Sequence, residues 1–337
     1  MIAKRSALAR VSLTTSRKVA LSLCLALCTL SISALAQQAN IITFGVPGSA
    51  YTYPYSINSA GAITGDYMYG GIQRGFLRAP DGSFTTVEPP GTWTQPLSIN
   101  SAGAIAGEYE DGAFFNHGFL RAPDGTFTTV DPPGSTYTGL LSLNSAGAIT
   151  GLYTDAQQVN HGFLRAPDGS FTTFDPVGSY ATYPVGINSS GAITGYYRDS
   201  AQQYHGFLRA PDGTITTFGA VEGQETFPQG INSAGEVTGA YGEGVNGFVR
   251  AADGTITTFA GIPSSINDAG RITGVYRNPE SGVYRGFVRR PDGTFTTFGL
   301  PGGTFLIEPY SINSVGAITG WYYANTHTGP QGFLLTP

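Results

Sequence analysis

A segment of about 44 residues repeats seven times along this chain. Each repeat contains an asparagine followed three residues later by glycine, at Asn58, Asn100, Asn144, Asn188, Asn232, Asn267 and Asn313. The spacings between these asparagines are 42, 44, 44, 44, 35 and 46 residues. A regular period of this length indicates an architecture in which each unit packs against its neighbours.

The turn residues within each repeat predict a four-stranded antiparallel sheet. The segment Asn-Ser-Ala-Gly has asparagine at the first and glycine at the fourth position of a type I turn, and Ala-Pro-Asp-Gly has proline at the second. Runs rich in Ile, Thr, Phe, Tyr and Val lie between these turns and suit a pleated surface. Four strands in about 44 residues are typical of a β-propeller blade, whereas parallel β-helices have shorter coils.

The two ends of the repeat region complement each other. The last repeat stops at Pro337 without the strand that ends the other repeats, and residues 40–49 match that strand as it occurs at 171–179. We therefore predict an all-β fold, a seven-bladed β-propeller of four-stranded antiparallel blades, closed by the N-terminal strand, which completes the last blade. Burial of Ile41, Ile42 and Phe44, at roughly 1.5 to 3 kcal/mol each, would contribute on the order of 5 kcal/mol to this closure.

The first 36 residues have the pattern of an export signal. Residues 1–18 contain five basic residues and no acidic one, residues 19–35 are mainly apolar, and Ala34-Leu35-Ala36 is a small-x-small cleavage pattern. We predict a signal peptide at 1–36, followed by a single propeller domain at 37–337 that is secreted or periplasmic in a bacterium. An uncleaved N-terminal anchor is the alternative.

Removal of this segment changes the chemistry available to the chain. Both cysteines and both lysines lie within it, so the remainder has 12 arginines against 22 acidic residues and can form no disulfide. Such an acidic surface repels the phosphate backbone of nucleic acids and anionic lipid headgroups. We expect no nucleic-acid partner, no membrane insertion of the mature chain, and a monomer.

Several residue types recur at the same place in every repeat, which favours a packing role. The recurring tyrosines are Tyr67, Tyr109, Tyr153, Tyr197, Tyr241, Tyr276 and Tyr322. The recurring phenylalanines are Phe76, Phe119, Phe163, Phe207, Phe248, Phe287 and Phe333. The recurring arginines are Arg78, Arg121, Arg165, Arg209, Arg250 and Arg289, which we expect to pair with acidic neighbours.

The histidines also recur at one place in the repeat, which favours a structural role over metal binding. His117, His161 and His205 occupy one position in consecutive repeats, and no spacing typical of a zinc site is present. Each Asp-Gly turn also offers too few oxygens for calcium. We therefore expect no bound metal, no cofactor and no catalytic residue.

At the level of the whole repeat, the consensus I-N-S-A-G-A-I-T-G-Y-Y followed by H-G-F-L-R-A-P-D-G resembles the bacterial extracellular HAF-type repeat. This sequence has glycine where that family has alanine. The resemblance covers almost the entire predicted mature chain. It implies a secreted repeat protein and supplies no catalytic residues.

Function is expected on one face of the propeller. The Asn-Ser-Ala-Gly and Pro-Asp-Gly turns should share one face (the turn face), and the other two connections of each blade should share the opposite face (the variable face), where the repeats differ. Functional residues concentrate on such loops above a rigid scaffold. The candidate ligand-binding residues are Tyr53, Trp93, Phe115, Tyr137, Tyr183, Phe227 and Trp321.

Three functions remain open. The first is a non-catalytic binding module that uses the variable face for protein or surface contacts, since Tyr and Trp are enriched at interfaces. The second is carbohydrate binding, because sugar rings stack on aromatic side chains. The third is a hydrolase or lyase with paired carboxylates, drawn from Glu108, Glu110, Asp111, Glu222, Glu225, Glu243 and Glu308.

Overall fold

The computed structural model describes residues 40–243, 246–300, 306–323 and 329–337, and the predicted signal peptide at 1–36 lies outside them. Residues 40–336 form one compact unit. The described residues contain 28 β-strands and no helix, so none of their elements is a helix that could cross a membrane.

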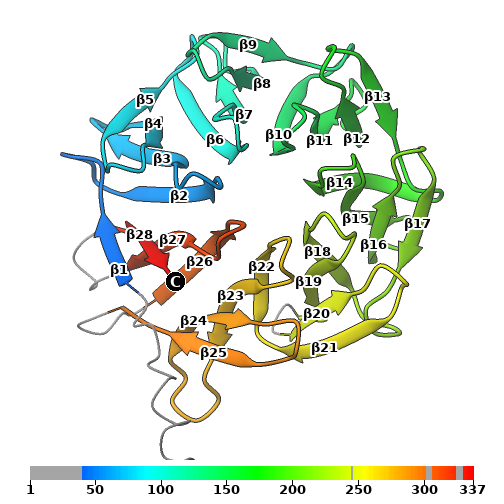
Figure 1. Cartoon of the computed structure of the whole chain (residues 1–337). Coiled ribbons are helices and arrows are strands. Elements are labelled where there is room, and N and C mark those ends of the chain that lie inside the picture. Colours follow the sequence, from blue (N-terminus) through cyan, green and yellow to red (C-terminus); the bar gives the residue numbers. More distant parts are fainter. Residues whose placement is uncertain (1–39, 244–245, 301–305, 324–328) are drawn as a thin grey trace, which may run out of the picture. The chain divides into compact units, whose positions relative to one another are not determined.

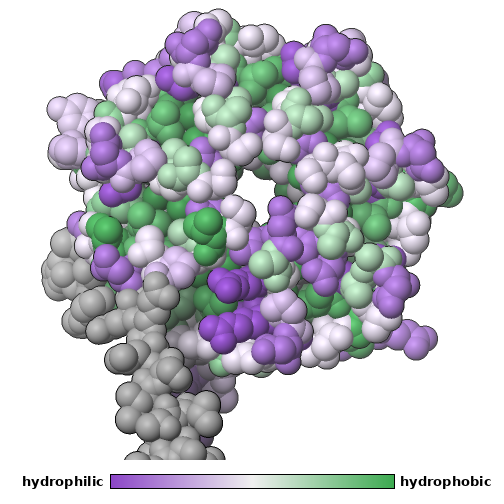
Figure 2. Space-filling view, in the orientation of Figure 1, coloured by the Kyte–Doolittle hydropathy of each residue, from purple (hydrophilic) through white to green (hydrophobic). Residues whose placement is uncertain are grey.

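The strands form seven four-stranded antiparallel sheets around a central opening (Figures 1 and 2). The following strands run from the innermost to the outermost of each blade. Blade 1 contains β2 (Thr52–Ile57), β3 (Ile63–Tyr69), β4 (Ile72–Arg78) and β5 (Phe84–Val87). Blade 2 contains β6 (Trp93–Ile99), β7 (Ile105–Glu110), β8 (Asn116–Arg121) and β9 (Phe127–Val130). Blade 3 contains β10 (Tyr137–Leu143), β11 (Ile149–Thr154), β12 (Asn160–Arg165) and β13 (Phe171–Phe174). Blade 4 contains β14 (Ser179–Ile187), β15 (Ile193–Asp199), β16 (Tyr204–Arg209) and β17 (Ile215–Phe218).

The remaining blades follow the same plan, except that the last one takes its outermost strand from the other end of the chain. Blade 5 contains β18 (Thr226–Ile231), β19 (Val237–Tyr241), β20 (Asn246–Arg250) and β21 (Ile256–Ala260). Blade 6 contains β22 (Ile262–Ile266), β23 (Ile272–Arg277), β24 (Tyr284–Arg289) and β25 (Phe295–Phe298). Blade 7 contains β26 (Leu306–Ile312), β27 (Ile318–Tyr323), β28 (Gln331–Thr336) and β1 (Asn40–Phe44). The predicted seven-bladed propeller, closed by its N-terminal strand, is confirmed.

The closing strand β1 pairs with β28 from Asn40 opposite Thr336 to Phe44 opposite Gly332. Phe44 is buried, and its ring lies under the guanidinium group of Arg78 in blade 1, at 4.9 Å. Ile42 is 42% exposed, so the sequence-based expectation that it is buried was wrong. Successive side chains of a strand point to opposite faces, and on this outermost strand one of those faces meets solvent.

A ring of asparagine hydrogen bonds provides a second closure. The hairpin between the first and second strands of each blade contains the recurring asparagine. Its Oδ1 atom accepts hydrogen bonds from backbone N–H groups of the same turn, as that of Asn58 does from Ala60 and Ala62. Its Nδ2 donates to the backbone carbonyl of the asparagine in the next blade, at 2.9 to 3.3 Å in all seven blades. The bond from Asn313 to Asn58 joins the last blade to the first.

The repeated aromatic residues form the packing between and within blades. The recurring phenylalanine of each third strand is at most 1% exposed, as expected for a core position. The six recurring arginines interact electrostatically with the aspartate of their own Asp-Gly turn, as Arg78 does with Asp81, and several also pack on aromatic rings. The guanidinium groups of Arg209, Arg250 and Arg289 lie 5.1 to 5.2 Å from the centre of a phenylalanine ring in the outermost strand of the preceding blade.

Candidate functional site

Each blade presents three positions at the variable-face end of its two innermost strands. The first position directly precedes the proline of the innermost strand, or Leu140 in blade 3, and the second directly follows that residue. The second position is a β-bulge in all seven blades, which changes the direction of its side chain. The third is the middle residue of the Gly-x-Tyr segment in the next strand, and it pairs directly with the first position, as Asp66 does with Tyr53.

These three positions vary between blades, while the residues around them repeat. The first position holds Tyr53, Gln95, Gly139, Tyr183, Phe227, Ile262 and Glu308. The second holds Tyr55, Leu97, Leu141, Val185, Gln229, Ser264 and Tyr310. The third holds Asp66, Glu108, Leu152, Tyr196, Ala240, Val275 and Trp321.

Polar and aromatic side chains gather in three neighbouring blades. We call this group the acidic sector, which consists of Glu308, Tyr310 and Trp321 of blade 7, Tyr53, Tyr55 and Asp66 of blade 1, and Gln95 and Glu108 of blade 2. Among the 21 residues at the three positions, three are acidic and none is basic, and all three acids belong to this sector. Glu108 and Glu308 were candidates from the sequence, whereas Asp66 was missed.

Asp66 is the most deeply buried acid of the sector, with only 1% of its surface exposed. Burial raises the pKa of its carboxyl group to about 7, although hydrogen bonds from Tyr55 and Gln95 act in the opposite direction. Gln95 Nε2 also donates to the hydroxyl of Tyr55 at 3.0 Å. Within the described residues, the Asp66 Oδ1 atom has no hydrogen-bond partner.

The two glutamates lie on either side of Asp66 in the ring. Glu108 is buried and accepts a hydrogen bond of 2.5 Å from the hydroxyl of Tyr137 in blade 3. Burial raises the pKa of Glu108, and the bond from Tyr137 partly offsets that rise. Glu308 is partly exposed, and burial raises its pKa as well.

Glu308 also borders a pocket of about 720 Å³ between blades 6 and 7. The rest of its lining comes mainly from apolar residues, including Ile262, Val275 and Leu306. Ile262, Ser264 and Val275 occupy the three positions of blade 6, so in this blade all three positions line the pocket. Its volume lies within the range of sites for small molecules.

Aromatic contacts connect blades 7 and 1 across the sector. The rings of Tyr53 and Trp321 meet edge to face at 5.3 Å, and those of Tyr55 and Tyr310 do so at 5.5 Å. The pKa of Tyr310 is raised by burial, and the charges of Glu308 and Asp66 add to this, so both carboxylates act on one ring. The predicted residues Tyr53 and Trp321 are therefore neighbours.

The other predicted ligand-binding residues are distributed around the ring. Tyr137 joins the sector through Glu108. Tyr183 stacks on Tyr196 at 5.0 Å, and Phe227 meets the same ring at 5.5 Å, which makes a second aromatic cluster in blades 4 and 5. Trp93 begins β6 opposite Glu110, and Phe115 is 57% exposed in the hairpin between β7 and β8.

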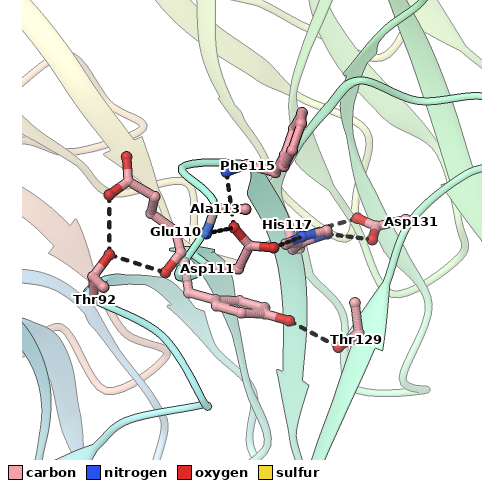
Figure 3. Close-up of polar contacts among 10 residues, drawn as sticks. Thr92, Glu110, Asp111, Ala113, Phe115, His117, Thr129 and Asp131 are labelled. Carbon is pink, nitrogen blue, oxygen red and sulfur yellow. Dashed lines mark hydrogen bonds and ion pairs between the residues drawn. The ribbon is translucent and has the colours of Figure 1, made fainter.

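The histidines form bridges at the outer strands of the variable face. His117 lies between two carboxylates, with Nδ1 2.7 Å from Asp131 and Nε2 3.3 Å from Asp111 (Figure 3). Burial lowers the pKa of His117, but the two carboxylates more than offset this and leave it raised. His161 makes the equivalent pair of contacts in blade 3. His205 in blade 4 keeps only the contact with Asp199, at 2.9 Å. The recurrence of these contacts favours a structural role for the histidines, which stays a prediction.

No cluster of three or more His, Cys, Asp or Glu side chains suited to a metal ion occurs in the part of the chain that the structure describes.

Comparisons with known proteins give similarity in fold. No family model and no curated protein matches the sequence. A streptogramin B lyase structure has 16% identity and a TM-score of 0.60, covering 88% of this chain and 97% of that one. Virginiamycin B lyase from Staphylococcus aureus has 14% identity and a TM-score of 0.61, covering 89% of this chain and all of that one. A prolyl endopeptidase structure has 12% identity and a TM-score of 0.58, covering 82% of this chain and 47% of that one.

Proposed function

We propose that this protein is a secreted, non-catalytic binding propeller that holds a carbohydrate at the variable-face end of its channel. The observation that carries this proposal is the acidic sector, where the buried carboxyl groups of Asp66 and Glu108 and the partly exposed Glu308 occur in three adjacent blades, together with contacting aromatic rings of blades 7 and 1. The resemblance to HAF-type repeats and the predicted export signal agree with a ligand outside the cytoplasm.

The sector offers the two kinds of contact that a sugar needs. Aromatic side chains such as Tyr53 and Tyr310 present apolar faces for the C–H groups of a sugar ring. Glu308 and Gln95 are partly exposed and supply an acceptor and an amide for hydroxyl groups. The adjoining pocket of about 720 Å³ is concave, which favours a small ligand over a flat protein partner.

Binding to a glycan array, followed by titration calorimetry, tests this proposal. We expect Glu308→Gln to weaken binding at least tenfold, because a hydrogen bond to a charged group is worth about 1.5 to 3 kcal/mol. Glu222→Gln is the matched control, since Glu222 is exposed on the connection between blades 4 and 5, outside the sector. Absence of any glycan ligand, or equal effects of the two changes, would contradict the proposal.

A lyase or hydrolase is the second candidate, and Asp66 is the observation that favours it. A carboxyl group with a pKa of about 7 is suited to donate or accept a proton near neutral pH. Mass spectrometry of a bound oligosaccharide after incubation with the protein distinguishes the two candidates. New chain ends that disappear with Asp66→Asn would favour an enzyme, and an intact oligosaccharide would favour the binding module.

A further inference from the structure

Building on the proposed carbohydrate site, we infer that the bound sugar carries a free, protonated amino group, which is held among the carboxylates and aromatic rings of the acidic sector. The ligand class is thus an amino sugar, either alone or within a glycan from which acetyl groups are missing.

The charge of the sector points to a cationic ligand. Asp66, Glu108 and Glu308 bring three acids to adjacent blades, and no basic residue occupies any of the 21 positions at this end of the channel. The arginines nearest in sequence are used elsewhere. Arg74 pairs with Glu88 at 2.7 Å, and Arg78 lies over a phenylalanine ring at the outer edge.

Asp66 supplies the second, independent observation. Its carboxyl group is almost fully buried, and although Tyr55 and Gln95 hydrogen-bond to this group, its Oδ1 atom has no hydrogen-bond partner within the described residues. An unpaired buried polar atom is costly, and buried charges are normally paired. A protonated amine donates three hydrogen bonds and brings the missing positive charge.

The surrounding rings suit a cation as well as a sugar face. An ammonium group is attracted to the face of a tryptophan or tyrosine ring within about 6 Å of its centre. Tyr53 contacts Trp321, and Tyr55 contacts Tyr310, so two pairs of rings flank the carboxylates of blades 7 and 1. Burial also raises the pKa of all three acids, a cost that a bound cation would offset. A hydroxyl or acetamido group at the same place would gain neither the charge pairing nor the cation–π attraction.

Titration calorimetry with two matched probes tests this inference. The probes are β-1,4-linked oligomers of glucosamine and of N-acetylglucosamine, of equal length, at a pH where the amine is protonated. We expect the glucosamine oligomer to bind at least tenfold more tightly than its acetylated counterpart. We also expect Asp66→Asn to reduce this preference at least tenfold, while Glu222→Gln leaves it unchanged.

The outcomes separate this inference from the function on which it rests. If the acetylated oligomer binds as tightly as the free amine, the inference fails and the carbohydrate site stands. If glucosamine and acetylated oligomers and every other glycan fail to bind, the proposed function fails too. Glu308→Gln, at a partly exposed position, provides a second test should Asp66→Asn fold poorly, and an undiminished preference in this variant would also overturn the inference.

Discussion

At the scale of single residues, burial of the Asp66 carboxylate lowers the free energy of unfolding at neutral and alkaline pH. Burial raises its pKa from an ordinary 3.8 to about 7, so the folded chain holds this proton more tightly than the unfolded chain does. Between those pH values the folded state binds more protons, and its stability therefore falls as the pH rises through this window. A shift of roughly three units corresponds to a few kcal/mol, about 4 at most.

We therefore expect Asp66→Asn to unfold at a higher urea concentration than the natural chain at about pH 8, and at nearly the same concentration at about pH 4. The amide carries no charge, so it avoids the cost of burying one. Urea denaturation curves at the two pH values measure this difference. An equal difference at both pH values would show that the carboxyl group titrates normally.

Gly186 marks a place where a repeated contact is missing. In five blades a serine Oγ accepts a hydrogen bond from a backbone N–H group of the next blade, as Ser98 does from the N–H of Leu143 at 3.1 Å. Blades 4 and 5 have Gly186 and Gly230 at this position. A Cβ atom built on Gly186 would lie 3.6 Å from the nitrogen of Ile231 and within ordinary contact distances of its neighbours.

Gly186→Ser is therefore expected to stabilise the protein by about 1 kcal/mol, through one hydrogen bond and a stiffer unfolded chain. For a chain of this size, that corresponds to a rise of about 2 °C in the melting temperature. Gly186→Ala serves as the control, because it adds the Cβ atom without the hydroxyl. A serine variant that melts no higher than the alanine variant would contradict the proposed hydrogen bond.

At the scale of elements, β1 closes the ring across the greatest separation in the sequence. It covers the edge of β28 and places Phe44 against blade 1. Since Ile42 is exposed, the apolar part of this closure comes from Ile41 and Phe44 of the strand, together with Val46, which follows it. The asparagine bond from Asn313 to Asn58 remains when β1 is removed.

A chain that starts at Ser49 is expected to melt about 10 °C lower than one that starts at Asn40, or to aggregate through the uncovered edge of β28. Loss of the strand removes on the order of 3 to 5 kcal/mol of burial and exposes unpaired backbone groups. Calorimetry and light scattering of the two chains provide the measurement. Equal melting temperatures would mean that the asparagine ring suffices to hold the first and last blades together.

The elements were predictable from the sequence because their signals are local. Turn residues and strand composition identify four strands per repeat, and the split last repeat predicts the closure that β1 makes. The site was less predictable. Tyr55 and Tyr310 lie on bulges, and a bulge changes which residues face the channel.

Asp66 could still have been found in the sequence. The middle residue of each Gly-x-Tyr segment differs from blade to blade, whereas the residues on either side are constant. That contrast is the signal for a functional position within a repeat. The variation of the exposed loops instead predicts Trp93 and Phe115, which lie outside the acidic sector.

At the scale of the whole molecule, the seven blades share one plan, and they differ at the three positions that form the proposed site. The asparagine ring, the buried phenylalanines and the turn-face hairpins repeat in every blade and maintain the ring. Differences between blades are concentrated at the variable-face end of the channel. The lyase and peptidase structures are similar to this chain in fold, and a fold by itself does not determine which chemistry it carries.

A crystal structure of the protein soaked with a glucosamine oligosaccharide tests the position of the site most directly. We predict density for a sugar ring beside Tyr53 and Trp321, with its amino nitrogen within hydrogen-bond distance of Glu308 or Asp66. A sugar bound instead at the turn face, or at the histidine bridges of the outer strands, would contradict this account.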